Sequence, residues 1–327
     1  MDKQLQDTFG RRFSYLRLSI TDACNFRCQY CLPNGYKKTS KEPFLSVDEI
    51  RRLVTALAEL GMWKIRLTGG EPTLRREFEE IASTISLIPG VKKMAFTTNG
   101  YRLARSAQAF YNAGLRAVNV SVDSLDPETF HKTTGQNKLK DVLDGIQAAE
   151  DVGFESVKIN AVLLKDFNES SLNSFLNFIR EKKCDVRFIE LMQTNENKAY
   201  FNEHHVSAQI MREKLIAQQW KLKPREEAEG PAEIWQHPEF LGRIGLIAPY
   251  ATGFCSTCNR LRVSSLGHLR LCLFGVGGIH LRPLLQNDSQ KEELKQLMIQ
   301  SLTTKKESHY LQQGNSGDTP HFASIGG

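Results

Sequence analysis

Three cysteines near the start of the chain have the type and spacing of ligands for an iron–sulfur cluster. Cys24, Cys28 and Cys31 form a C-x3-C-x2-C triplet. Three thiolates this close together can ligate three irons of a cubane cluster and leave the fourth iron without a protein ligand, open for chemistry. Structural zinc is the alternative. A closed zinc site needs four ligands, however, and neither a His nor a fourth Cys lies near this triplet.

A second set of three cysteines lies toward the other end of the chain. Cys255 and Cys258 are separated by two residues, and Cys272 follows after thirteen more. The missing fourth ligand again suggests a cluster with an open iron. A zinc site completed by His268 is the alternative, because this imidazole would make a plausible fourth ligand.

Two arginines adjoin the second triplet and point to a phosphorylated ligand. Arg260 and Arg262 could be ordinary surface charges, but paired guanidinium donors beside a metal site suit the recognition of phosphate. The formal net charge of +6 also favours an anionic partner. No long Lys/Arg run is present, so nucleic acid and a phosphorylated small molecule both remain open.

The sequence between the cysteines predicts a scaffold of alternating strands and helices. Short apolar or β-branched runs predict strands at Tyr15–Ile20, Lys64–Thr68, Lys92–Thr97, Ala117–Val122, Ser156–Val162 and Val186–Ile189. Helical periodicity predicts one helix from a Ser46–Glu49 capping box to Gly61, and others at Arg75–Leu87, Leu103–Asn112, Leu139–Val152 and Glu169–Lys182. Such alternation indicates an α/β fold with parallel strands, either an open doubly wound sheet or an incomplete barrel.

Residues at the ends of these strands are further candidates, because parallel α/β folds place their chemistry there. Gly69 and Gly70 follow the second expected strand and would let a ligand approach the backbone closely, although alone they read as an ordinary turn. Thr97 and Ser121 lie at later strand ends, where turn chemistry is the alternative. Lys158 needs an anionic partner if it points inward, and a solvated edge strand is the other interpretation.

Length and composition indicate a cytoplasmic protein with a large core. The chain has 327 residues, of which 40% are hydrophobic, and we expect a main domain over residues 1–230 and a smaller region over residues 231–327. No segment has the apolar run of a signal peptide or a membrane span. In a reducing compartment, the seven cysteines are expected to be ligands rather than disulfides.

The ordered motifs resemble those of radical S-adenosylmethionine (SAM) enzymes, and over nearly the whole chain those of the molybdenum cofactor biosynthesis protein A family, the GTP 3′,8-cyclases. The resemblance rests on the first triplet with Tyr30, the segments 65–72, 97–100 and 187–192, the second triplet with its Cys-Asn-Arg-Leu-Arg core, and a terminal Gly326-Gly327. It implies an incomplete (β/α)6 barrel with a C-terminal extension that carries a second cluster. It also implies two [4Fe–4S] clusters, SAM as cofactor and GTP as substrate.

The resemblance assigns roles to individual residues. Cys24, Cys28 and Cys31 would hold the cluster that binds SAM, and Cys255, Cys258 and Cys272 the cluster that binds the guanine of GTP. Contacts to SAM would come from Tyr30, Gly70, Ser121 and Met192. Contacts to GTP would come from Arg17, Arg66, Thr97, Lys158, Arg260 and Arg262, with Arg17, Arg260 and Arg262 in catalytic roles. The Gly326-Gly327 tail would lie in the active site.

The resemblance also implies an environment for the protein. An electron-donor protein would reduce the first cluster, and the next enzyme of the pathway would convert the product into cyclic pyranopterin monophosphate. We expect no nucleic acid, no membrane, and a monomer or homodimer. The segments 193–207 and 224–231 match no motif, and Cys184 is expected to be a buried apolar residue. A different radical SAM enzyme, such as one that modifies a peptide, and a non-enzymatic metalloprotein that binds nucleic acid are the alternatives.

Overall fold

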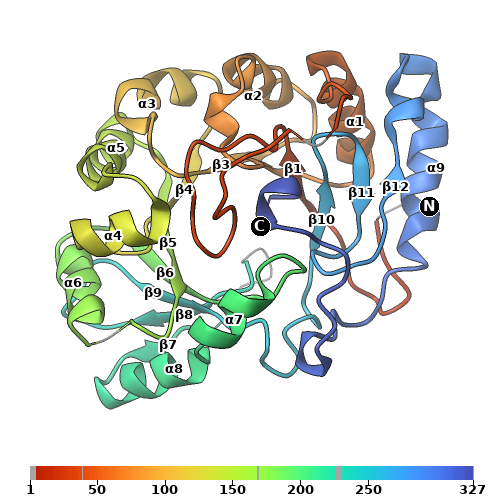
Figure 1. Ribbon diagram of the computed structural model, residues 1–327. Coiled ribbons are helices and arrows are strands. Elements are labelled where there is room, and N and C mark those ends of the chain that lie inside the picture. The colour runs from red at the N-terminus through yellow and green to blue at the C-terminus, as the bar shows by residue number, and fades with distance from the viewer. Residues whose placement is uncertain (1–4, 39, 168, 225–229, 327) are drawn as a thin grey trace.

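The computed structural model describes residues 5–38, 40–167, 169–224 and 230–326. Six parallel strands follow one another in chain order and curve around a common axis, with helices on their outer side (Figure 1). These strands are β1 (Tyr15–Ser19), β2 (Lys64–Thr68), β3 (Lys93–Thr98), β4 (Ala117–Ser121), β5 (Ser156–Leu163) and β6 (Asp185–Glu190). The sheet does not close on itself, so the predicted incomplete (β/α)6 barrel is confirmed.

The outer layer contains α1 (Val47–Glu59), α2 (Phe78–Ser86), α3 (Leu103–Asn112), α4 (Pro127–Thr134), α5 (Leu139–Val152) and α6 (Glu169–Arg180). The predicted capping box of α1 is present, because the hydroxyl of Ser46 accepts from the backbone of Glu49 and the Glu49 carboxylate accepts from the backbone of Ser46. The predicted start of α2 at Arg75 is wrong. Arg75 is extended, and its guanidinium donates to two backbone carbonyls, so the helix begins three residues later.

Alternation along the strands separates the core from the barrel interior. In β1, Leu16 and Leu18 are fully buried in the hydrophobic core, while Arg17 between them lines an internal cavity. The core also contains Cys184, which is buried as expected. Polar residues at inward positions, such as Arg17, are therefore available to a ligand.

The C-terminal part extends the same sheet at both edges. On one side, β10 (Arg260–Val263) runs parallel to β1 and continues into β11 (His268–Arg270) and β12 (Ile279–His280). On the other side, β9 (Ile244–Ile247) runs parallel to β6 and continues into β8 (Glu233–Gln236) and β7 (Lys221–Leu222). The sheet thus crosses the predicted boundary at residue 230, and that division stays a prediction.

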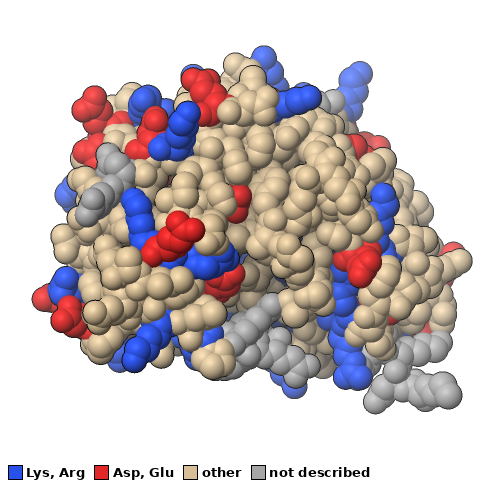
Figure 2. Space-filling view, turned by 90° about the horizontal axis from the view of Figure 1, so that it is seen from below, with Lys and Arg blue, Asp and Glu red and all other residues tan. Residues whose placement is uncertain are grey.

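Three more helices flank these additions: α7 (Lys198–His204), α8 (Ala208–Ala217) and α9 (Lys291–Leu302). Like α4 in the outer layer, they were not predicted from the sequence. The last segment of the chain turns back, and its end lies inside the ring of strands (Figure 1). On the face in Figure 2, Lys and Arg are interspersed with Asp and Glu, without a continuous basic band among the described residues. No helix in the described part of the chain has the length and apolarity to cross a bilayer.

Candidate active site

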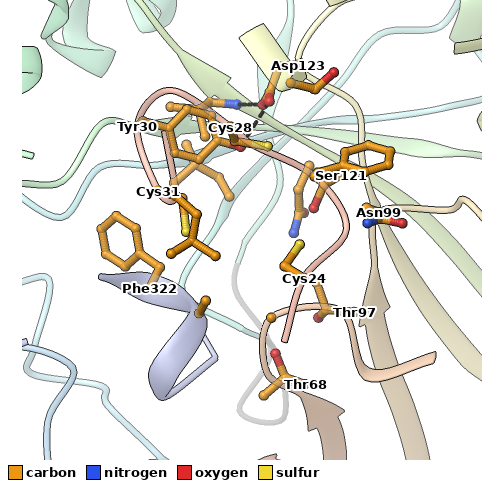
Figure 3. Close-up of a pocket in the computed structure, with 18 of the residues that line it drawn as sticks. Cys24, Cys28, Tyr30, Cys31, Thr68, Thr97, Asn99, Ser121, Asp123 and Phe322 are labelled. Carbon is orange, nitrogen blue, oxygen red and sulfur yellow. Dashed lines mark hydrogen bonds between the residues drawn. The ribbon is translucent and has the colours of Figure 1, made fainter. Parts of the chain in front are cut away.

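Two adjoining cavities occupy the barrel interior. The first cavity, of about 170 Å³, lies at the strand ends and is lined by the first cysteine triplet and by all four predicted SAM contacts: Cys24, Cys28, Tyr30, Cys31, Gly70, Ser121 and Met192. Figure 3 shows the three cysteines around this cavity together with Ser121, Asp123 and Phe322. The structure therefore brings together side chains from the first loop, from β4 and from the end of the chain.

The glycines after β2 fit closely against the cysteine loop. A Cβ on Gly69 would lie 2.1 Å from the carbonyl oxygen of Thr21, and a Cβ on Gly70 would lie 2.3 Å from that of Ala23. The backbone nitrogen of Gly70 donates to the Thr21 carbonyl at 3.0 Å. Only glycine permits this approach of two backbones, so the turn has a packing role that fixes the loop carrying Cys24.

Glu71 is fully buried next to these glycines and acts as a hydrogen-bond acceptor for a neighbouring loop. Its carboxylate accepts from the backbone nitrogens of Thr73 at 3.0 Å and Asn99 at 2.6 Å, and from the hydroxyls of Thr73 at 2.6 Å and Thr98 at 2.9 Å. Burial raises the pKa of Glu71, and these hydrogen bonds partly oppose the shift. The carboxylate thereby ties the turn after β2 to the end of β3.

Tyr30, between the second and third cysteines, is held on two sides. Its hydroxyl donates to the carboxylate of Asp123 at 2.9 Å, and the same carboxylate accepts from the backbone of Val162 at 2.9 Å (Figure 3). The side-chain amide of Asn197 donates to the carbonyls of Tyr30 at 3.2 Å and Met192 at 3.0 Å. Asp123 and Asn197 carried no functional signal in the sequence, because a turn carboxylate and a loop amide are ordinary.

The second cavity, of about 320 Å³, extends from the first toward the opposite ends of the strands. It is lined by the second cysteine triplet and by five of the six residues expected to contact GTP: Arg17, Arg66, Lys158, Cys255, Cys258, Arg260, Arg262 and Cys272. Thr97 instead lines the first cavity, where its hydroxyl accepts from Arg66 at 3.3 Å. A cavity with this many cations can bind a polyanion.

Tyr15 and Lys64 of this second cavity were not predicted from the sequence, whereas Arg187 belongs to the segment 187–192 that carries the resemblance. Lys64 and Arg187 line it and add two cations. Burial and neighbouring cations lower the pKa of Lys64 to about 8, and burial lowers that of Arg187 to about 10. Tyr15 accepts from Arg66 at 2.5 Å, and although burial raises its pKa, Arg66, Arg17 and Lys64 lower it to about 7. Strand alternation could have identified Tyr15 and Lys64. Tyr15 lies two residues before Arg17 and Lys64 two residues before Arg66, so each pair shares one face of its strand.

Lys158 has the anionic partner that its inward position requires. Its ammonium group lies 2.5 Å from the carboxylate of Asp185, the residue opposite it on β6. Arg243 donates to the same carboxylate through two nitrogens, at 2.8 and 2.9 Å. Although burial raises the pKa of Asp185, the hydrogen bonds and charges of Arg243 and Lys158 lower it below its usual value. The interpretation of β5 as a solvated edge strand is therefore wrong.

The chain end reaches both cavities. Phe322 and Ala323 line the first cavity, and the carbonyl of Gly326 accepts from Arg262 and, at 3.1 Å, from Arg17. Gly326 has a φ of +63°, and a Cβ there would lie 2.1 Å from Cγ2 of Thr68. The predicted placement of this tail in the site fits Gly326, whereas Gly327 lies outside the described residues.

The thiols of the two triplets differ electrostatically. Burial raises the pKa of Cys24 to about 12 and that of Cys31 to about 11. In the second triplet, burial raises the pKa of Cys255, whereas the pKa of Cys258 is lowered because Arg260 and other nearby cations outweigh the effect of burial. Metal binding requires the thiolate, so loading of the first triplet must release protons.

The alternative zinc ligand does not lie with the second triplet. His268 stacks on His280 with ring centroids 4.8 Å apart and is not among the residues that line the second cavity. Within the described residues, no three potential ligands converge closely enough for a single metal ion. The three thiolates of each triplet, spread around the wall of one cavity, fit the ligand set of a cubane cluster.

The chain matches two protein-family models and resembles solved structures of one class of enzyme. The radical SAM superfamily model matches residues 18–179, and the model for Molybdenum Cofactor Synthesis C matches residues 184–311. The crystal structure of SuiB from Streptococcus suis bound to S-adenosylmethionine is similar in fold, with a TM-score of 0.57 and 13% identity over 86% of this chain and 68% of that chain. The fold and the cysteine-lined cavity define a radical SAM enzyme, which uses SAM and an iron–sulfur cluster.

Curated relatives narrow the assignment. The GTP 3′,8-cyclase of Aeromonas hydrophila is 55% identical over 99% of this chain and 96% of its own length. Those of Psychromonas ingrahamii and Yersinia pestis are each 53% identical, covering 100% and 99% of this chain and 96% and 99% of their own. The chain therefore belongs to the GTP 3′,8-cyclase family.

Proposed function

We propose that this chain converts GTP into 3′,8-cyclo-7,8-dihydro-GTP, the first step of molybdenum cofactor biosynthesis. The observation that carries the proposal is the pair of adjoining cavities in one barrel. One is lined by the first cysteine triplet, and the other by the second triplet and a set of Lys and Arg residues. SAM and a nucleoside triphosphate can thus bind side by side, which fits the names of the relatives.

In the first cavity, the chain's own residues hold SAM. Cys24, Cys28 and Cys31 ligate a [4Fe–4S] cluster, and the backbone at Gly70 and the side chains of Tyr30, Ser121 and Met192 face SAM. When bound, this cluster would supply the electron for reductive cleavage of SAM, and SAM would supply the carbon radical that takes hydrogen from C3′ of GTP. The buried walls of the cavity exclude water from this reactive species.

In the second cavity, we assign Cys255, Cys258 and Cys272 to a second [4Fe–4S] cluster, which makes two clusters in the chain. This cluster would hold the guanine, while cations of the cavity would bind the triphosphate. The cations proposed for the triphosphate are Arg17, Arg66, Lys158, Arg260 and Arg262, together with Lys64 and Arg187. Holding both ends of GTP would keep C3′ close to guanine C8, so the ring closure would benefit from proximity and orientation. One electron from the reductant and one proton would then convert the resulting base radical into the dihydro product.

The wider setting follows from this activity. An electron-donor protein reduces the first cluster, and the next enzyme converts the product into cyclic pyranopterin monophosphate. We propose that the enzyme works in the cytoplasm as a monomer or homodimer, with residues 1–230 forming the barrel domain and residues 231–327 the extension.

The test is an anaerobic incubation of the reconstituted protein with SAM, reductant and GTP, followed by mass analysis. The expected products are methionine, 5′-deoxyadenosine and a nucleotide with the mass of GTP and a changed chromatographic position. Cleavage of SAM without any cyclised nucleotide would refute the proposed substrate. Iron analysis of variants that lack one triplet at a time tests the two clusters separately, since each variant should retain about half the iron.

A further inference from the structure

The boundary between the two cavities contains one strongly hydrogen-bonding side chain. Among the described residues, Asn160, Ile189 and Met192 line both cavities. Ile189 is a hydrocarbon, and the thioether of Met192 is a weak acceptor. The carboxamide of Asn160 carries both a strong acceptor and a strong donor. Asn160 can therefore hydrogen-bond to a ligand on either side.

The inward face of β5 runs from one cavity to the other. Because side chains alternate along a strand, residues 156, 158, 160 and 162 share this face. Ser156 and Lys158 line the second cavity, Val162 lines the first, and Asn160 between them lines both. The position of Asn160 at the boundary is thus set by the register of the strand.

The amide oxygen of Asn160 has no hydrogen-bond partner in the described part of the structure, although the half-buried side chain lines both cavities. Its Oδ1 is inaccessible to solvent and accepts no hydrogen bond. The strand itself is fixed, because the backbone carbonyl of Asn160 accepts from the nitrogen of Val122 at 2.9 Å. Opposite it on β6, Arg187 also has a buried Nε that donates to no described group. Buried polar atoms without partners are rare in native proteins, and a bound ligand is one common explanation.

We propose that Asn160 is a positioning residue that hydrogen-bonds to a ribose hydroxyl of the nucleoside in each cavity. A hydroxyl can donate to the amide oxygen or accept from the amide nitrogen, so one carboxamide serves two nucleosides at once. The contact holds the adenosyl group of SAM in register with the ribose of the substrate. This inference rests on the proposed function and adds to it the residue that couples cleavage of SAM to reaction of the substrate.

The substitution Asn160→Leu keeps the approximate volume and removes both hydrogen-bonding atoms. In reconstituted enzyme, we expect the ratio of 5′-deoxyadenosine to cyclised product to rise about fivefold to tenfold over wild type, the effect of one lost hydrogen bond. Less deuterium from 3′-deuterated GTP should enter 5′-deoxyadenosine, because the misplaced radical takes hydrogen from elsewhere. Asn160→Thr restores a hydroxyl on a residue that suits a strand, and should return the ratio toward wild type.

Asn119 provides a matched control. It is an inward asparagine on the neighbouring strand β4, opposite Lys158, and lines only the second cavity. Asn119→Leu should alter the response to GTP without raising the ratio of 5′-deoxyadenosine to product. A binding measurement adds a readout independent of turnover. In wild type, S-adenosylhomocysteine should strengthen GTP binding through the shared contact, and Asn160→Leu should reduce this linkage at least threefold.

The outcomes separate the inference from the proposed function. If wild type forms no cyclised nucleotide, the proposed function fails first. If wild type forms it, and Asn160→Leu keeps the iron content, the product ratio and the binding linkage of wild type, the role of Asn160 is overturned. An equal rise of the ratio in Asn119→Leu also overturns it, because the effect would then be a general disturbance of the barrel wall.

Discussion

Substitution of Gly326 by Ala should detach the C-terminal tail from the active site. The added Cβ would lie 2.1 Å from Cγ2 and 2.6 Å from Oγ1 of Thr68, well inside contact distance. The φ of +63° adds a conformational cost of about 1–2 kcal/mol for any residue with a Cβ. Overpacking costs about 1–3 kcal/mol more. The total of about 2–5 kcal/mol shifts the equilibrium toward a released tail by about 30-fold to 4000-fold, at 1.4 kcal/mol for each factor of ten.

The free energy of the contacts that hold the tail is similar to this cost. The Gly326 carbonyl accepts from Arg17 and Arg262, and a hydrogen bond to a charged group is worth about 1.5–3 kcal/mol. Ala323 and Ile325 are buried and add apolar anchoring. We therefore expect cyclised product to fall at least tenfold in Gly326→Ala, while iron content and GTP affinity change little. Deletion of Gly326 and Gly327 together should have the same effect.

Carboxypeptidase digestion followed by mass spectrometry measures release of the tail directly, since a docked end resists trimming. Gly314→Ala is the matched control, because its φ of +76° carries the same backbone cost, while no atom lies within 4 Å of the added Cβ. Wild-type turnover and wild-type resistance to digestion in Gly326→Ala would refute the reasoning and leave the tail without a functional role.

Four other predictions test separate parts of the site. Cys24→Ala should abolish SAM cleavage but keep the spectrum of the second cluster, and normal 5′-deoxyadenosine formation would contradict the assignment. Replacing Arg260 or Arg262 with Ala should keep the iron content. The GTP concentration that gives half the maximal rate should rise about 10-fold to 150-fold, which corresponds to the loss of one charged hydrogen bond; full activity of both variants at limiting GTP would exclude a role of these arginines in GTP binding. GTP affinity should fall as pH rises from 7 to 9, because the triphosphate favours protonated Lys64, whose pKa is about 8, and neutral Tyr15, whose pKa is about 7; in a Tyr15→Phe background, Lys64→Arg should flatten the profile, and an equally steep profile there would speak against it. In a double-mutant cycle, Tyr30→Phe and Asp123→Asn should couple by about 1 kcal/mol in the KM for SAM, and additivity would show that their hydrogen bond is irrelevant to SAM binding.

The repeated core of the fold could be predicted from the sequence because its signals are local. The strands at Lys64–Thr68 and Ala117–Ser121 alternate large apolar residues with polar or small ones, and the cap of α1 is a four-residue pattern. The strands of the extension could not be predicted in this way. Those at Lys221–Leu222 and Ile279–His280 have two residues each, which is too short for any alternation to be visible. Antiparallel pairing with the adjacent strands β8 and β11 defines them.

The site was predictable where chemistry is encoded in spacing and not where it depends on tertiary contacts. The two cysteine triplets and the Gly69–Gly70 turn could be identified by eye. Tyr15, by contrast, looks like a core aromatic at the start of a strand. Alternation places it on the same face as Arg17, but its closeness to Lys64 and Arg66 follows only from the register of β1 with β2. The sequence predicted that an inward Lys158 needs an anionic partner, but it did not identify Asp185 as that partner.

The pairing of β1 with β10 explains why two distant cysteine sets can serve one reaction. These strands are parallel neighbours, with Arg17 opposite Arg262. Cys24 follows the end of β1, whereas Cys258 precedes the start of β10, so the two triplets lie at opposite edges of the barrel. β1 has five residues, which span about 16 Å at the usual rise per residue. If GTP is held by its guanine at the edge with the second triplet, its ribose extends toward the SAM bound at the edge with the first triplet. Asn160 lines both cavities where the two ligands would meet.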